Sequence, residues 1–149
     1  MLAAEAAYQT MKANMKAASY VYFIECDDGG VRPIKIGYSF DPIGTRLVDL
    51  QIGSPWPLKV MFVTPGHAEL ERSLHAEFLY ERMRGEWFRP SRAILRYILN
   101  AKRAATLVSC PDHTREIDRI GAIDATAGSA DVRRAIYALD DVPSLAPAA

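Results

Sequence analysis

The sequence predicts a small α+β domain, with a central three-stranded antiparallel sheet flanked by helices and a short helical C-terminal extension. Two observations support this fold class. Two short runs rich in β-branched and aromatic residues, Tyr20–Ile24 and Ile34–Gly37, are separated by strong turn residues. After them, apolar residues recur about four positions apart, which is typical of helices that bury one face.

The first two strands form a hairpin. Residues 20–25 alternate with β-branched and aromatic side chains and therefore predict a strand. Asp27–Gly30 is turn sequence, because its glycines adopt positive φ without strain. Val31–Ile36 returns as the second strand, and Pro33 indicates an edge or a bulged start.

A helix follows the hairpin. Asp41 is the expected N-cap and Pro42 the first helical residue. We expect this helix to point Leu47 and Leu50 inward and to end near Gly53.

A third strand and a second helix come next. Leu58–Val63 predicts the strand, and the pattern turns helical from His67 to about Met83. The apolar stripe of this helix consists of Leu70, Leu74 and Phe78. Glu71 and His75 stand four residues apart, so they are neighbours on the helix surface.

The domain closes with a short apolar return and a third helix. Gly85–Phe88 is a candidate small strand, and Pro90-Ser91 opens a helix that ends the domain near residue 105. The buried face of that helix consists of Ile94, Leu95, Ile98 and Leu99.

The remaining sequence divides the chain further. We expect an N-terminal helical extension over 1–19, the main domain over 20–105, and a helical extension with a loose tail over 106–149. Two helical segments, Arg115–Ala122 and Ala130–Leu139, surround a glycine-containing turn. Both a helix-turn-helix and simple packing helices fit this pattern.

Composition narrows the class of protein. The 149 residues carry no net charge, yet residues 81–103 hold seven basic side chains against two acidic ones. Such a stripe suits phosphate contacts, and a solvated helix face explains it equally well. Two cysteines make no disulfide framework, and no apolar run is long enough for a membrane span, so we expect a cytoplasmic protein. His67 and His113 lack partners at zinc-binding spacing.

Several motifs recur together between Tyr20 and Phe88. They are YVY at 20–22, KIG at 35–37, RL..LQ.G.P.P from Arg46 to Pro57, E...H..F from Glu71 to Phe78, and GEWF at 85–88. This set resembles the GIY-YIG nuclease superfamily, in a phage and bacterial subgroup with a KIG second motif and a C-terminal GEWF motif. The resemblance implies a DNA endonuclease that uses Mg²⁺ or Mn²⁺ and has DNA as its partner.

The resemblance also implies roles for individual residues. Glu71 is the expected metal ligand, since a hard divalent ion prefers carboxylate oxygen. The expected catalytic residues are Tyr22 as proton acceptor, Lys35, Arg46 and His75. The expected DNA-binding residues are Tyr38, Ser39, Arg89, Arg92 and Arg96. Because the compact domain has no clear reader element, a homodimer or a protein partner stays open as the source of specificity.

Other interpretations remain open for these residues. Tyr20 shares a strand face with Tyr22, Lys35 suits the solvent face of an edge strand, and Glu71 suits a surface salt bridge. Lys35 also stands where the resemblance predicts a tyrosine. The loop before Arg46 is one residue longer than the resemblance predicts. These two departures favour the alternative of a catalytically inactive module that binds DNA or a protein.

Overall fold

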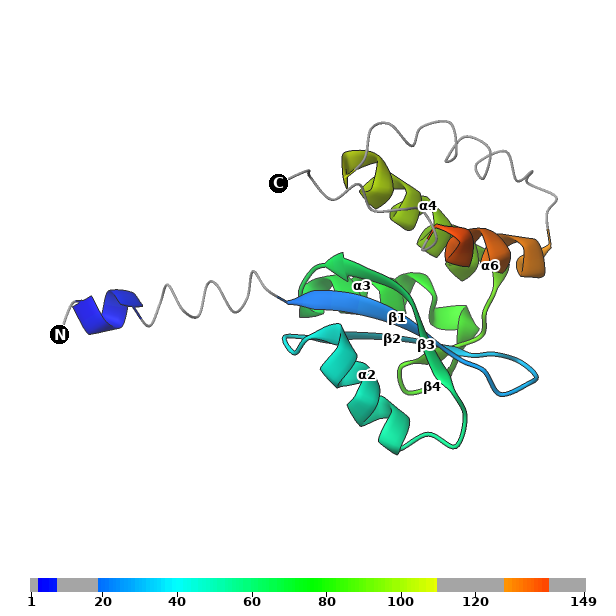
Figure 1. Ribbon diagram of the computed structural model, residues 1–149, viewed down its shortest axis with the longest axis horizontal. Coiled ribbons are helices and arrows are strands. Elements are labelled where there is room, and N and C mark those ends of the chain that lie inside the picture. Colours follow the sequence, from blue (N-terminus) through cyan, green and yellow to red (C-terminus); the bar gives the residue numbers. More distant parts are fainter. Residues whose placement is uncertain (1–2, 8–18, 110–127, 140–149) are drawn as a thin grey trace, which may run out of the picture. The chain divides into compact units, whose positions relative to one another are not determined.

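The computed structural model describes residues 3–7, 19–109 and 128–139 of the chain (Figure 1). The chain divides into two compact units, Met1–Arg89 and Pro90–Ala149, and each unit is described separately. Residues 3–7 are helical. The expected helix over 115–122 and the expected tail lie outside the described residues. Within the described part of the chain, no helix combines the length and the apolarity needed to cross a bilayer.

The first unit contains a five-stranded antiparallel sheet, which confirms the α+β class but corrects the expected number of strands. The strand order is β3-β1-β2-β5-β4. The strands are β1 (Tyr20–Cys26), β2 (Ile34–Ser39), β3 (Leu58–Pro65), β4 (Arg82–Arg84) and β5 (Trp87–Phe88). The three expected strands form one half of the sheet, and the short β4–β5 ribbon adds two more strands beside β2.

The β1–β2 hairpin is closed by a polar loop. The Asp28 carboxylate accepts the backbone N–H groups of Gly30 and Arg32, each at 2.9 Å. Arg32 adopts a left-handed backbone with φ of 58°, and its Nε lies 2.5 Å from Oε1 of the buried Glu25. Arg32 of the loop therefore forms an ion pair with the buried Glu25 of β1.

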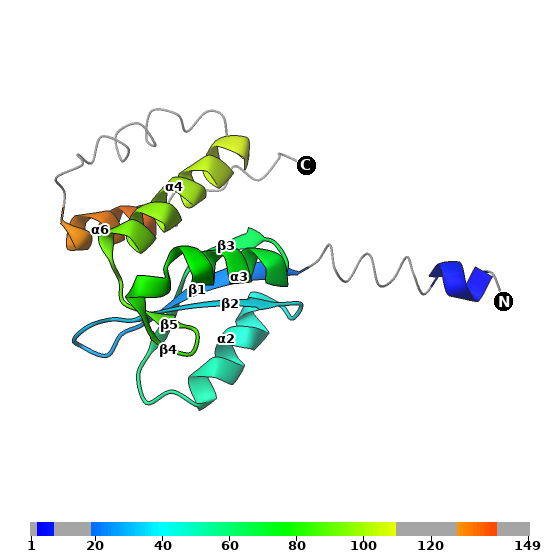
Figure 2. The ribbon, with the colours of Figure 1, turned by 180° about the vertical axis from the view of Figure 1, so that it is seen from behind.

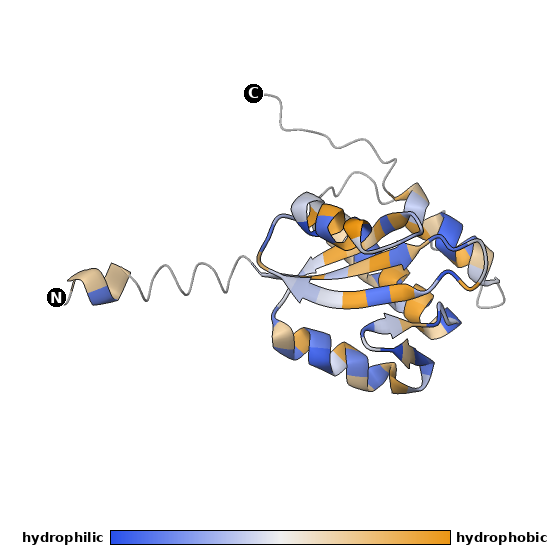
Figure 3. Cartoon of the chain, turned by 90° about the horizontal axis from the view of Figure 1, so that it is seen from below, coloured by the Kyte–Doolittle hydropathy of each residue, from blue (hydrophilic) through white to orange (hydrophobic). Residues whose placement is uncertain are grey.

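Two helices cover opposite faces of this sheet (Figures 1 and 2). Helix α2 (Ile43–Ile52) contacts β3 and has no fully buried residue, and Figure 3 shows hydrophilic and hydrophobic residues mixed along it. Leu47 and Leu50 are half-buried instead of fully inward. The helix begins one residue later than expected, because Pro42 occupies the N-cap position without a side-chain cap.

Helix α3 (Ala68–Glu77) contacts β1 and β2 and buries Leu74 and Glu71. It ends well before the expected Met83. Phe78 is buried at the helix C-terminus, and the 3₁₀ helix η1 (Leu79–Glu81) then leads directly into β4. The apolar stripe therefore stops at Phe78, and the residues after it belong to the sheet.

In the described residues of the second unit, two helices pack on each other, α4 (Arg92–Ser109) and α6 (Ser129–Ala138). All four expected apolar residues of α4, Ile94, Leu95, Ile98 and Leu99, are buried. The expected helix over 130–139 is also confirmed. The division near residue 90 differs from the expected boundary near 105, which stays a prediction.

Candidate functional site

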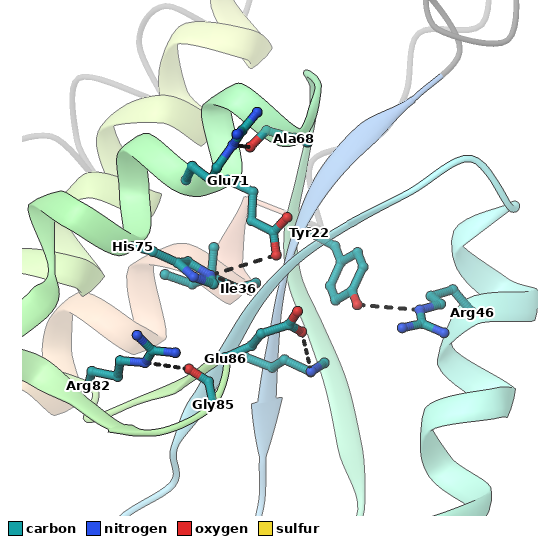
Figure 4. Close-up of polar contacts among 11 residues, drawn as sticks. Tyr22, Ile36, Arg46, Ala68, Glu71, His75, Arg82, Gly85 and Glu86 are labelled. Atoms are coloured by element: carbon teal, nitrogen blue, oxygen red, sulfur yellow. Dashed lines mark hydrogen bonds and ion pairs between the residues drawn. The ribbon is translucent and has the colours of Figure 1, made fainter.

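The candidate site lies at the point along β2 where its pairing with β5 ends. Strand β5 pairs with β2 only at Ile34 and Lys35, and the last backbone bond runs from Ile36 N–H to the Glu86 carbonyl at 3.0 Å. Side chains from several elements gather beside this end of the ribbon (Figure 4). We call them the edge cluster, which consists of Tyr22, Lys35, Arg46, Glu71 and Glu86.

Tyr22 and Arg46 form the first contact of the edge cluster. The Arg46 Nε–H group donates to the Tyr22 hydroxyl at 3.3 Å, which joins α2 to β1 (Figure 4). Tyr22 is fully buried, and its ring lies against Gly37, its cross-strand neighbour. A Cβ atom at Gly37 would lie 2.5 Å from the Tyr22 hydroxyl, so only glycine leaves room for the phenol.

The ionisation of this pair follows from burial. Loss of hydration raises the pKa of the Tyr22 phenol, and the charges of Glu86 and Glu71 raise it further, whereas Arg46 lowers it. The contact with Tyr22 in turn raises the pKa of Arg46. At neutral pH the pair is therefore a neutral phenol beside a guanidinium cation.

Tyr20 lies near Tyr22, with ring centres 6.3 Å apart, but its hydroxyl bonds elsewhere. Its hydroxyl donates to the backbone carbonyl of Asp41, and burial raises the pKa of its phenol. Of the two tyrosines on one strand face, Tyr22 is thus the one in contact with Arg46.

Lys35 is largely covered, with 12% of its side chain exposed. Its ammonium group donates to Glu86 Oε2 at 2.5 Å and lies 5.6 Å from the centre of the Trp87 ring. The interpretation of Lys35 as a solvent-facing edge residue is therefore wrong, because β5 pairs with β2 at this position. Glu86 and Trp87 together fix the position of the charge.

Glu71 is 9% exposed and reaches the edge cluster from α3. Burial raises the pKa of its carboxyl group, and the neighbouring Glu86 carboxylate raises it further by charge and by a side-chain contact. The charges of His75 and Lys35 lower it. Glu71 is therefore a carboxyl group whose ionised form is poorly stabilised by the folded protein alone.

His75 has a structural contact. Its Nε2 lies 2.9 Å from the Ile36 carbonyl and 3.8 Å from Glu71 Oε1. A carbonyl oxygen can only accept, so Nε2 carries the proton in this contact. His75 thus supplies Ile36 with a donor where β5 has ended, and its role in catalysis stays a prediction.

The expected DNA-binding residues are divided between the two units. Tyr38 is exposed near the end of β2 and lies against Phe40, with ring centres 6.0 Å apart. Ser39 is buried, and its hydroxyl accepts the Asp41 N–H group, so its side chain stabilises the turn. Arg89 is exposed at the end of the first unit, whereas Arg92 and Arg96 belong to α4 in the second.

The chain was compared with protein families, with curated proteins and with solved structures. The model of the T5orf172 domain matches residues 19–106, which is more than half of the chain. The chain belongs to the T5orf172 domain family. The T5orf172 domain is nuclease-like and associated with DNA binding, and it is often linked to endonuclease activity. No curated protein and no solved structure matches the chain.

This match corrects the family expected from the motifs. T5orf172 is a different family from GIY-YIG, and no GIY-YIG model matches the chain. The motifs at 20–88 all lie inside the matched residues 19–106, so they come from the segment that carries the T5orf172 signal. Short strand and helix motifs identified the right segment and assigned it to the wrong family.

Two residues of this T5orf172 site were not among the expected site residues. Gly37 makes room for the Tyr22 ring. The sequence shows that a glycine ends the KIG motif, but it does not show which side chain that glycine contacts. Glu86 contacts Lys35. Its approach to Glu71, from a position fifteen residues away, has no local signal in the sequence.

The edge cluster also offers ligands of a definite kind. Within residues 3–7, 19–109 and 128–139, no group of three or more His, Cys, Asp or Glu side chains is arranged to hold a metal ion. Two carboxylates are nevertheless close together, and Mg²⁺ is commonly bound by one or two carboxylates with waters and substrate phosphates completing its shell. The donor set therefore fits a hard divalent cation.

Proposed function

We propose that this T5orf172 domain hydrolyses DNA phosphodiester bonds as an endonuclease that requires Mg²⁺ or Mn²⁺. The observation that supports it best is the meeting of Arg46, Tyr22 and Glu71 from α2, β1 and α3 at the end of the β5 pairing (Figure 4). A permanent cation, a phenol and a carboxylate are the groups that phosphodiester hydrolysis needs.

Arg46 binds the phosphate. Its Nε–H is occupied by Tyr22, which orients the planar group and leaves the two terminal nitrogens for phosphate oxygens. Because the Tyr22 contact raises the pKa of Arg46, the guanidinium keeps its charge and stabilises the charge that develops on the phosphoryl oxygens.

Tyr22 acts in its phenolate form: after its hydroxyl proton has been lost to solvent, the phenolate oxygen accepts the proton of the attacking water. Burial opposes this step because it raises the pKa of the phenol, and Arg46 favours it because its charge stabilises phenolate. Glu71 holds the divalent ion, which when bound supplies a Lewis acid for the phosphate oxygens. Exposed Tyr38 and the arginines at 89, 92 and 96 contribute to DNA affinity rather than to the reaction.

A supercoiled-plasmid nicking assay in Mg²⁺ or Mn²⁺ tests this proposal. We expect nicking by the wild type and losses of at least about a hundredfold in Glu71→Ala and Tyr22→Phe. Glu77→Ala is the matched control, because Glu77 is an exposed carboxylate on the same helix. Gel retardation of DNA should be similar for all four proteins, since distributed basic residues dominate affinity. Normal cleavage by Glu71→Ala would exclude this site.

One observation favours a second candidate, a DNA-binding module without cleavage. Tyr22 has no exposed surface and Lys35 is already bonded to Glu86, so neither group is directly accessible to a phosphate. This candidate predicts steeply salt-dependent DNA binding, with no nicking in either metal.

A further inference from the structure

Glu86 is held in place by two anchors. Its backbone carbonyl accepts the Ile36 N–H group, and its Oε2 accepts the Lys35 ammonium group at 2.5 Å. The preceding Gly85 adopts a positive φ of 57°, which turns the chain from β4 into β5. The side chain remains 42% exposed, so a solute has access to it.

A second carboxylate approaches Glu86 from α3. Figure 4 shows the Glu71 and Glu86 carboxylates directed toward one another beside the Tyr22 ring. Glu86 acts on Glu71 both through its charge and through a side-chain contact, and burial is the larger effect on Glu71. Two carboxylates at this separation repel each other unless a proton or a cation lies between them.

The cations near the pair leave Glu71 poorly compensated. Lys35 is bonded to Glu86. His75 is 3.8 Å from Glu71, and its Nε2 proton is directed at the Ile36 carbonyl 2.9 Å away. A carboxylate needed only to hold Lys35 would gain nothing from lying beside Glu71, since that neighbour opposes its charge.

We propose that Glu86 is a second carboxylate ligand of the divalent cation and binds it together with Glu71. This inference rests on the proposed function, since it concerns the same ion, and it assigns to the GEWF segment a role in ion binding. It also makes Lys35 and the cation competitors for Glu86. Lys35 stands on β2 two residues before Gly37, the cross-strand neighbour of Tyr22, so a Lys35 released from Glu86 would add a free cation on the strand face of Tyr22.

Titration of metal-free protein with Mn²⁺ by calorimetry tests the assignment without any cleavage. We expect one site in the wild type, with affinity at least about tenfold lower in Glu71→Gln and in Glu86→Asp. Glu86→Asp keeps the charge and shortens the side chain, so it separates ligation from a general electrostatic effect. Lys35→Met should bind Mn²⁺ more tightly, and the exposed Glu77→Gln should match the wild type.

Circular dichroism confirms that each variant is folded, and plasmid nicking is measured in parallel. Wild-type affinity in Glu86→Asp would overturn the second-ligand assignment while leaving the proposed nuclease intact. Mn²⁺ binding that needs both carboxylates, in a protein that does not nick DNA, would support the ion site and remove the proposed function. Absence of Mn²⁺ binding to the wild type would overturn the ion site.

Discussion

Two buried carboxylates in the first unit have opposite surroundings. Glu25 is 1% exposed, and Arg32 Nε lies 2.5 Å from its oxygen. Glu71 is 9% exposed, its ion-pair contact is His75 at 3.8 Å, and the charge with the largest effect on its pKa is that of another acid, Glu86. The first carboxylate is compensated by its own hairpin, whereas the second is left with a raised pKa. The difference separates a carboxylate that stabilises the fold from one suited to binding a cation.

Removal of Arg32 should give the largest loss of stability. Arg32→Ala leaves Glu25 buried without its cation, and we expect the free energy of unfolding to fall by about 2–3 kcal/mol, since Arg32 is itself partly exposed. Alanine and arginine have similar backbone costs at φ of 58°, so the change isolates the side chain. Urea unfolding measures the difference, and exposed Arg72→Ala is the control, with an expected change below about 0.5 kcal/mol. If Arg32→Ala were as stable as Arg72→Ala, Arg32 would not stabilise the buried Glu25, and the proposed difference between Glu25 and Glu71 would be wrong.

Gly37→Ala should have the next largest effect. The added methyl group would lie 2.5 Å from the Tyr22 hydroxyl and 2.6 Å from its ring carbon Cζ, so the buried ring must shift. We expect a loss of about 2 kcal/mol from overpacking, together with loss of nicking as Tyr22 leaves Arg46. Gly44→Ala provides the control, because nothing lies within 4 Å of its Cβ position and alanine favours the α2 helix. If both alanine variants were equally stable, Tyr22 would not be confined by Gly37.

Glu71→Gln should have the smallest effect on stability, and of opposite sign. The folded protein raises the pKa of Glu71 above the ordinary value of 4.5 for a glutamate side chain. Protonated Glu71 is therefore favoured in the fold, and its contribution to stability is fully present below pH 4.5 and lost as pH rises through the raised pKa. In metal-free buffer the variant should be more stable than the wild type at neutral pH, and the difference should vanish below about pH 4. Thermal unfolding across this range measures it, and a destabilised variant at pH 7 would mean that Glu71 is compensated like Glu25.

The sequence predicted the elements that local chemistry determines. Strands over 20–25 and Val31–Ile36 were expected from β-branched and aromatic residues around a glycine turn, and the observed strands are Tyr20–Cys26 and Ile34–Ser39. The buried face of α4 was expected from its apolar spacing. Strand β4 was missed, because its Arg-Met-Arg sequence has no strand signal and follows a helical stripe without a break. Its position depends on pairing with β5 and on the turn at Gly85.

The contacts of the candidate site could not be predicted from the sequence. Tyr22, Arg46 and Glu71 were expected from the family resemblance, and the structure brings them near one another, while their roles stay predictions. Lys35 and Glu86 are 51 residues apart, and His75 and Ile36 are 39 apart. No local periodicity encodes such pairs, because they exist only after α3 and the β4–β5 ribbon have packed beside β2.

The two-residue length of β5 has a consequence for motion. The bond from Ile36 N–H to the Glu86 carbonyl is the last rung of this short ladder, and fraying there would separate Glu86 from Lys35 while the β3-β1-β2 half stayed intact. The hydrogen-exchange rate of the Ile36 amide would therefore report how often this end of the ribbon opens, independently of global unfolding. Such a local opening would let Lys35 and Glu86 separate while the core strands β3, β1 and β2 stay paired.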